Sequence, residues 1–301
     1  MAQVSLRGLR PLPGDLSGPD GKSRGGAPTF DTGGKEVVIE RRKIRQIKAG
    51  EDAWLEDVLV TEEPLEIYAR EEFLARLQAL PEDKEALVKG FLLTEGLIRE
   101  ASQVHSIHLD GGPSGKGATK AQVIAHIPAE EIQKWRSQAT LASGCGGALS
   151  GGKIDLEDCQ RKFDLSFRIS ADEVLALARE FQARSKLFRE TGGVHSAAIA
   201  STNRILSFAE DIGRHNAVDK AVGLLWGPKM NFTDKILLTS GRITLDIAAK
   251  MARIGAPIVI SRAAATASAV RLAEEVHMAL IGFVRGRRMN IYSAPWRVEG
   301  T

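Results

Sequence analysis

In the second half of the chain, segments whose hydrophobic residues have the spacing typical of strands alternate with segments that have the spacing typical of helices. Ser170 and Glu173 form a capping-box pattern, which predicts the start of a helix with Val174 and Phe181 on its apolar face. We expect strands at 194–201, 205–208, 236–239, 257–260, 281–284 and 289–292, and helices from 171 onward and at 217–226, 243–254 and 266–280. This alternation predicts an α/β layer structure with a largely parallel sheet.

The first half is richer in strand-like patterns. We expect strands at 37–39, 44–47, 54–61, 65–68, 104–109 and 121–127. One amphipathic stretch, 82–98, predicts a helix with Leu87, Phe91 and Leu92 toward a core. The fold class expected is therefore an α/β/α layer domain at the C-terminal end and a smaller β-rich α+β domain before it.

Two segments break the regular pattern and set the domain boundaries. Residues 1–34 contain eight Gly and four Pro, too little apolar surface to offset the entropy of ordering, so we expect a disordered tail. Residues 143–152 are Gly-rich, and we expect 143–165 to be a flexible loop and linker. The β-rich subdomain then covers 35–142 and the α/β domain covers 166–301.

Composition excludes several classes of protein. The 301 residues are 43% hydrophobic, and 41 Lys and Arg against 38 Asp and Glu leave a net charge of +3, which argues against a nucleic-acid coat. No apolar run reaches the roughly 18 residues of a membrane helix, and no secretion signal is evident. Two cysteines, Cys145 and Cys159, cannot form a disulfide scaffold, so a cytoplasmic location is expected.

Cys145 is the sharpest chemical feature because it lies between Gly144 and Gly146. Glycines allow a tight bend and let another molecule approach the sulfur, which could act as a nucleophile or accept a sulfur atom. The alternative is an incidental cysteine in a hinge. Cys159 could form a disulfide with Cys145, but we expect an ordinary surface or half-buried residue.

Polar clusters lie at the ends of predicted strands, next to the following loop or helix. His195 could be a general base or orient a ligand, or it could be a hydrogen-bonded core histidine. The stretch 210–216 contains Asp211, Arg214 and His215 just before a helix. It predicts either a ligand site at the strand-to-helix loop or a capped helix start with a salt bridge.

Further loops favour a phosphate-bearing ligand. Ser240 and Arg242 follow one strand and Arg262 follows the next, each just before a helix whose first N–H groups favour anions. Near the C-terminus three arginines fall within six residues, which is either a solvated basic turn or an anion clamp. The six residues are Phe283, Val284, Arg285, Gly286, Arg287 and Arg288.

Taken together, these motifs resemble the formate dehydrogenase accessory sulfurtransferase family (FdhD/NarQ) over about Val58 to Tyr292. The stretch Asp211-Ile212-Gly213-Arg214-His215-Asn216 carries the resemblance most specifically. It is supported by the sequences at 60–67, 90–96, 144–146, 193–195, 217–220, 239–242 and 282–288.

The resemblance implies a sulfur carrier with a C-terminal domain similar to cytidine deaminase. A cysteine desulfurase would load a persulfide on Cys145, and the sulfur would pass to bis-molybdopterin guanine dinucleotide before it enters the formate dehydrogenase catalytic subunit. The cargo would bind at 283–288, assisted by the polar residues above. A cytoplasmic homodimer is implied, with no protein-bound metal and neither nucleic acid nor membrane as partner.

One departure from the family pattern opens an alternative. The family's Cys-x-x-Cys reads Cys145-Gly146-Gly147-Ala148 here, so exchange between two thiols of the motif is impossible. A non-catalytic chaperone that binds and delivers the cofactor is therefore the second hypothesis. A zinc deaminase is the third, but His195 is followed by Ser196-Ala197 instead of the required His-x-Glu, and the Cys pair is missing.

Overall fold

The computed structural model describes residues 38–111, 118–138, 140–141, 149–150, 156–157, 159, 163–228 and 230–300. The chain divides into two units, Met1–Lys35 and Glu36–Thr301, and the first lies outside the described residues together with the predicted tail. Within the second unit the mixed α/β class is confirmed. The cytidine deaminase-like layering and the predicted domain boundaries stay predictions.

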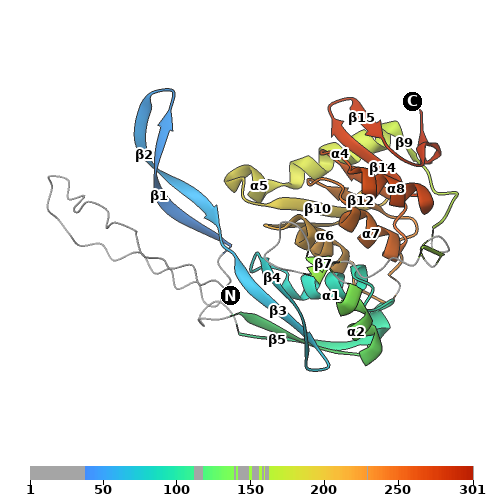
Figure 1. The fold of residues 1–301 in the computed structure, drawn as a ribbon. Helices are drawn as coiled ribbons and strands as arrows, with labels where there is room; N and C mark the ends of the chain where they lie inside the picture. The colour runs from blue at the N-terminus through green and yellow to red at the C-terminus, as the bar shows by residue number, and fades with distance from the viewer. Residues whose placement is uncertain are drawn as a thin grey trace, which may run out of the picture. The chain divides into compact units, whose positions relative to one another are not determined.

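The described chain begins with a two-stranded hairpin, β1 (Ile39–Lys48) and β2 (Glu51–Val60) (Figure 1). Its turn, Ala49-Gly50, has positive φ at both residues, which suits the right-handed twist of a tight hairpin. The two expected strand pieces at 37–39 and 44–47 thus belong to one continuous strand from Ile39 onward. Exposed cross-strand ion pairs, Arg41–Glu56 and Arg45–Asp52, stabilise the ribbon.

A four-stranded sheet follows in the order β4-β3-β6-β5. Its strands are β3 (Glu63–Ala69), β4 (Glu72–Ala79), β5 (Val104–Asp110) and β6 (Thr119–Ala125). The β3–β6 pair is parallel, and the β3–β4 and β5–β6 pairs are antiparallel.

Two helices share a core with this sheet, α1 (Lys84–Thr94) and α2 (Ala129–Gln138), and a short 3-10 turn, η1 (Ala101–Gln103), precedes β5. The predicted core positions of α1, Leu87, Phe91 and Leu92, are all buried. Trp135 of α2 packs edge-on against Phe91, with ring centroids 5.9 Å apart.

The second half forms a six-stranded sheet in the order β11-β10-β12-β13-β14-β15. Its strands are β10 (His195–Ala200), β11 (Ile205–Asp211), β12 (Ile236–Thr239), β13 (Ile258–Ser261), β14 (Ala279–Arg285) and β15 (Arg288–Ile291). The expectation of a largely parallel sheet is wrong, because β12–β13 and β13–β14 are parallel whereas the other neighbouring pairs are antiparallel. Short hairpin connections at 201–204 and 286–287 impose the antiparallel pairing of β10 with β11 and of β14 with β15.

Helices cover both faces of this sheet. Helix α4 (Ala171–Arg184) shares one core with Leu238 and Ile260, and its capping box at Ser170 and Glu173 is confirmed. The opposite face, with Leu237 and Val259, shares the larger core with α6 (Arg214–Gly223), α7 (Leu245–Ile254) and α8 (Ala267–Glu275). Because α1 belongs to this larger core and packs on α6, the two sheets are joined through helices (Figure 1).

Short elements complete the chain. Helix α5 (Lys186–Thr191) precedes β10, and β9 (Ile169–Ser170) pairs in parallel with β16 (Val298–Glu299), which follows the 3-10 turn η2 (Pro295–Arg297). Strands β7 (Thr140–Leu141) and β8 (Leu149–Ser150) pair antiparallel. The pairing places Leu141 opposite Leu149, the two described residues that flank segment 142–148.

Candidate functional site

Several predicted site residues meet at one edge of the six-stranded sheet, where β10 begins and β11, β12 and β13 end. His195 is paired with Asp211 across β10 and β11, and Thr239 is paired with Ser261 across β12 and β13. Because β10 is antiparallel to β12, the start of β10 lies at the same edge as the end of β12. We call this region the carboxyl edge.

The loops after β12 and β13 are joined into one surface at the carboxyl edge. The Ser261 hydroxyl donates to the Gly241 carbonyl at 2.6 Å, and the Ile243 N–H donates to the Ala264 carbonyl at 2.9 Å. Helices α7 and α8 begin there, with Thr244 and Thr266 as their N-caps. Two helix N-termini therefore open side by side at this edge, and each favours negative charge.

His195 and Ser240 form a polar pair on this surface. The Ser240 hydroxyl is 3.2 Å from His195 Nδ1 and accepts a hydrogen bond from the Ser196 N–H at 3.0 Å. Burial, reinforced by the nearby Arg214 guanidinium, lowers the pKa of His195 below its usual range. At neutral pH the imidazole is uncharged and can act as a hydrogen-bonding group.

Arg214 contributes a positive charge that acts on His195. It is the first residue of α6, and its side chain runs over Gly241: a Cβ at Gly241 would lie 3.1 Å from both Cβ and Cδ of Arg214. The missing side chain of Gly241 thus provides the space along which the arginine stem lies.

His215 lies below the surface. Its side chain is 7% exposed, and Nε2 is 3.9 Å from Asp246 Oδ2. Burial, together with the positive charges of Lys250 and Arg214, lowers the pKa of His215 to about 3. His215 is therefore a neutral part of the wall at physiological pH.

The arginine-rich stretch forms the hairpin between β14 and β15, beside the loop that follows β13. Arg285 Nε donates to the Arg262 carbonyl at 3.3 Å, and the Phe283 N–H donates to the Ala263 carbonyl at 3.1 Å. The side chains of Arg285, Arg287 and Arg288 are exposed, whereas Val284 is buried. Of the predicted clamp, the arginines can reach a ligand and Val284 faces the core.

Phe283 is held in an uncommon backbone conformation at this bulge in β14. Its φ is 53°, and the Arg288 guanidinium lies 6.0 Å from the centre of its ring. Gly282 beside it allows close packing, since a Cβ there would lie 2.8 Å from the Ala263 carbonyl oxygen. Strained conformations of this kind are concentrated at ligand sites.

The two remaining predicted residues, Arg242 and Asp211, differ in their exposure. Arg242 is exposed in the loop before α7, at the carboxyl edge. Asp211 is fully buried, and its carboxylate accepts hydrogen bonds from the backbone N–H groups of Leu80 and Gly213, at 3.1 Å each. The structure therefore places Asp211 inside the protein, out of reach of a ligand.

The two cysteines are placed differently. Cys145 lies outside the described residues, in the segment that joins β7 to β8. Cys159 is 2% exposed and belongs to the larger core. The expectation that Cys159 is a surface or half-buried residue is wrong; despite its charged sequence neighbours, its side chain packs inside.

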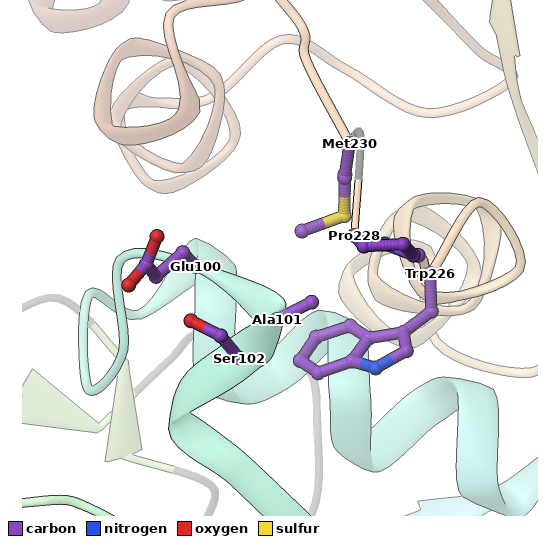
Figure 2. Close-up of a pocket in the computed structure, with 7 residues that line it drawn as sticks. Glu100, Ala101, Ser102, Trp226, Pro228 and Met230 are labelled. Carbon is purple, nitrogen blue, oxygen red and sulfur yellow. The ribbon is translucent and has the colours of Figure 1, made fainter.

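A pocket of about 330 Å³ lies beyond the C-terminal end of α6, away from the carboxyl edge. Figure 2 shows Trp226, Pro228 and Met230 on one side and residues of η1 on the other. None of the predicted site residues lines this pocket.

The described residues contain no group of three His, Cys, Asp or Glu side chains arranged to hold a metal ion. No helix in the described part of the chain has the length and apolar composition to cross a membrane.

Comparison with known proteins places the chain in a family. The profile of the FdhD/NarQ family matches residues 60–299. A sulfur carrier protein FdhD from Listeria innocua is 33% identical over 263 residues, 87% of this chain and 99% of the relative. A protein of the same name from Bacillus subtilis is 35% identical over 265 residues, 88% of this chain and 99% of the relative.

A solved structure supports the assignment. The crystal structure of a formate dehydrogenase accessory protein from Desulfotalea psychrophila has a TM-score of 0.67 and 26% identity to this chain, and covers 87% of this chain and 100% of its own. The resemblance inferred from the motifs is confirmed. Because the family profile and the relatives both span most of the sequence, the chain belongs to the FdhD/NarQ family.

Proposed function

We propose that this protein is a sulfur carrier that serves formate dehydrogenase, with Cys145 as the carrying residue. The observation that carries the proposal is its similarity, over nearly the full length of the relatives, to proteins named sulfur carrier protein FdhD. Cys145 is favoured as the carrier because Gly144 and Gly146 flank it in the sequence, and glycines allow another molecule to approach a neighbouring thiol. Cys159 is disfavoured because it is buried in the core.

Loading follows ordinary thiol exchange. The Cys145 thiolate attacks the outer sulfur of a persulfide on a cysteine desulfurase. The sulfur–sulfur bond of the donor breaks, the donor cysteine leaves as a thiolate, and Cys145 holds the outer sulfur as a persulfide. The pairing of β7 with β8 supports this role, since it brings Leu141 and Leu149, on either side of the Cys145 segment, opposite each other.

Delivery requires two electrons if the sulfur leaves as sulfide. Because Ala148 replaces the second cysteine of the family motif, no neighbouring thiol of that motif supplies them. An external thiol can attack the inner sulfur, release sulfide and leave Cys145 in a mixed disulfide. Alternatively, the outer sulfur passes directly to the metal centre of the cargo, which then supplies the electron pair.

The cargo site of this proposal is the carboxyl edge. A guanine dinucleotide carries phosphates that are negative at neutral pH, and the edge offers Arg214, Arg262 and the exposed Arg285 beside two helix N-termini. Neutral His195 and Ser240 add hydrogen-bonding groups without charge. The ligand class that suits this surface is a dinucleotide such as bis-molybdopterin guanine dinucleotide, bound as substrate.

The absence of a second motif cysteine favours one other candidate, a chaperone that binds and delivers the cofactor without handling sulfur. Both functions use the same cargo site. They differ in whether the thiol of Cys145 is needed.

Formate dehydrogenase activation separates the two. In cells that lack their own FdhD/NarQ protein, we expect the wild type and Cys159→Ala to restore formate dehydrogenase activity and Cys145→Ala to fail, with all three present at equal levels. Full activity with Cys145→Ala would refute sulfur carriage by Cys145 and leave the chaperone.

A further inference from the structure

Three polar side chains of the β11–α6 region are buried where the two sheets meet. Asp211, Asn216 and Lys220 are exposed by 0%, 2% and 1%. Asp211 and Asn216 belong to the most specific motif in the sequence and Lys220 follows four residues after it, yet none of the three reaches the surface on which a ligand would lie. Their burial requires partners inside the protein.

Those partners are backbone groups at the end of β4. The Asn216 amide donates to the Gln78 carbonyl at 2.7 Å, and the Lys220 ammonium donates to the Leu80 carbonyl at 3.3 Å. In return, the Leu80 N–H donates to Asp211 at 3.1 Å. We call the three side chains Asp211, Asn216 and Lys220 the clasp.

The clasp also bonds within itself and to the start of α6. Lys220 forms an ion pair with Asp211 at 2.7 Å, and Asn216 donates to the second oxygen of Asp211 at 3.0 Å. That oxygen also accepts the N–H of Gly213, the N-cap of α6, at 3.1 Å. Both ends of the first turn of α6 are thus fixed to one carboxylate.

Stability alone does not account for such an arrangement. An interior ion pair contributes little compared with well-packed apolar residues of the same size, although removing one partner is costly. What the clasp adds is a defined position, because directional bonds to Gln78 and Leu80 fix α6 along its own axis. Arg214, which lies between Gly213 and Asn216 in sequence, is then held where its stem crosses Gly241.

We propose that the clasp is a positioning element of the cargo site, which holds Arg214 at the carboxyl edge for contact with a phosphate. Asp211 thereby has a positioning role in place of the ligand contact predicted from its sequence. The inference rests on the proposed function, because it takes the carboxyl edge as the site of the guanine dinucleotide.

A double-mutant cycle with GDP as the probe tests this role. Binding of GDP by calorimetry is compared for the wild type, Asn216→Ala, Arg214→Ala and the double variant. We expect Asn216→Ala to weaken GDP binding about tenfold when Arg214 is present and by less than about twofold when it is absent, since the clasp acts through that arginine. Asn203→Ala, an exposed asparagine in the β10–β11 turn, is the matched control and leaves affinity unchanged.

Other results overturn the inference in distinguishable ways. Equal losses of affinity with and without Arg214 would mean that Asn216 supports the fold in general. No GDP binding by the wild type would refute the cargo site and the clasp's role with it, while persulfide formation on Cys145, measured separately, reports on the carrier function. If Asn216→Ala does not fold, Asn216→Ser, which keeps one donor, takes its place in the same cycle.

Discussion

Gly90 of α1 lies directly against the main chain of Asp219 on α6: a Cβ at Gly90 would be 1.7 Å from the Asp219 carbonyl oxygen. The contact is reciprocal, because a Cβ at Gly223 of α6 would be 1.9 Å from the Ala86 carbonyl oxygen of α1. The backbones of α1 and α6, which belong to different halves of the chain, are therefore in direct contact where the two helices cross. This crossing brings the four-stranded sheet and the six-stranded sheet into one folded unit.

Replacement of either glycine forces the helices apart. We expect Gly90→Ala and Gly223→Ala each to destabilise the protein by about 3 kcal/mol or more, because the added methyl meets backbone that cannot rotate away. Gly227→Ala, where the new Cβ would meet nothing within 4 Å, is the matched control and changes stability by less than about 0.5 kcal/mol. Urea unfolding measures all three, and a Gly90→Ala protein as stable as the control would contradict the close crossing.

A buried charge cluster beside the crossing gives a second prediction. The Lys250 ammonium lies 2.7 Å from Glu95 and 2.9 Å from Asp219, and all three side chains are at most 3% exposed. Lys250→Met leaves two carboxylates without their cation, and we expect a loss of about 3–5 kcal/mol. Adding Glu95→Gln and Asp219→Asn removes the charges and should recover at least half of that loss in the same unfolding assay. A triple variant no more stable than Lys250→Met would show that the charges are not the cause.

The buried His215 predicts a dependence of stability on pH. Burial, Lys250 and Arg214 lower the pKa of His215 to about 3, below its value of about 6.5 in the unfolded chain. The unfolded chain therefore takes up a proton first as the pH falls, so the stabilisation from neutral His215 is present above pH 6.5 and is lost below it. Between pH 7.5 and pH 5 this loss amounts to about 2 kcal/mol.

The His215→Gln variant isolates this contribution. Asp219 acts in the opposite direction, since burial raises its pKa to about 6 and the folded protein gains a proton there. Because Asp219 is common to both proteins, its effect cancels when the free energies of unfolding of wild type and variant are compared at the two pH values. Identical pH dependence in both would show that His215 is not the neutral buried group described.

The exposed arginines of the β14–β15 hairpin are predicted to provide much of the anion affinity. The triple variant Arg285→Ala, Arg287→Ala, Arg288→Ala lacks three positive side chains of this hairpin. We therefore expect it to bind GDP at least about tenfold more weakly and with a smaller salt dependence. The β1–β2 hairpin supplies a control with the same change of charge, Arg41→Ala, Arg42→Ala, Arg45→Ala, and should leave affinity within about twofold. Equal losses in both triple variants would indicate only a general charge effect.

Local signals predicted much of the fold. The capping box at Ser170 located α4, and the apolar runs located β12 and β13. Strand β4 was missed because its turn, Arg70-Glu71, adopts positive φ at both residues without glycine or asparagine. Helix α2 was missed because it is mostly polar, with Ile132 and Trp135 as its buried anchors.

The site was less predictable, because several of its relations involve backbone. The strand-to-helix loops indicated the carboxyl edge, and His195, Ser240 and Arg214 do meet there. The role of Asp211 could not be predicted from the sequence. Its partner in the other half of the chain is the backbone N–H of Leu80, and a backbone partner does not require any particular residue type. Apolar periodicity does not encode whether neighbouring strands run parallel; the short connections at 201–204 and 286–287 are the sequence signal for the two antiparallel hairpins.

Sulfur carriage by Cys145 is tested most directly by the mass of the protein after incubation with a cysteine desulfurase and cysteine. We predict a gain of about 32 Da, one sulfur atom, on the Cys145 peptide of the wild type and of Cys159→Ala, removable by a reducing thiol. Cys145→Ala should show no such gain. An unmodified Cys145 in the wild type, or the same gain in Cys145→Ala, would contradict the account.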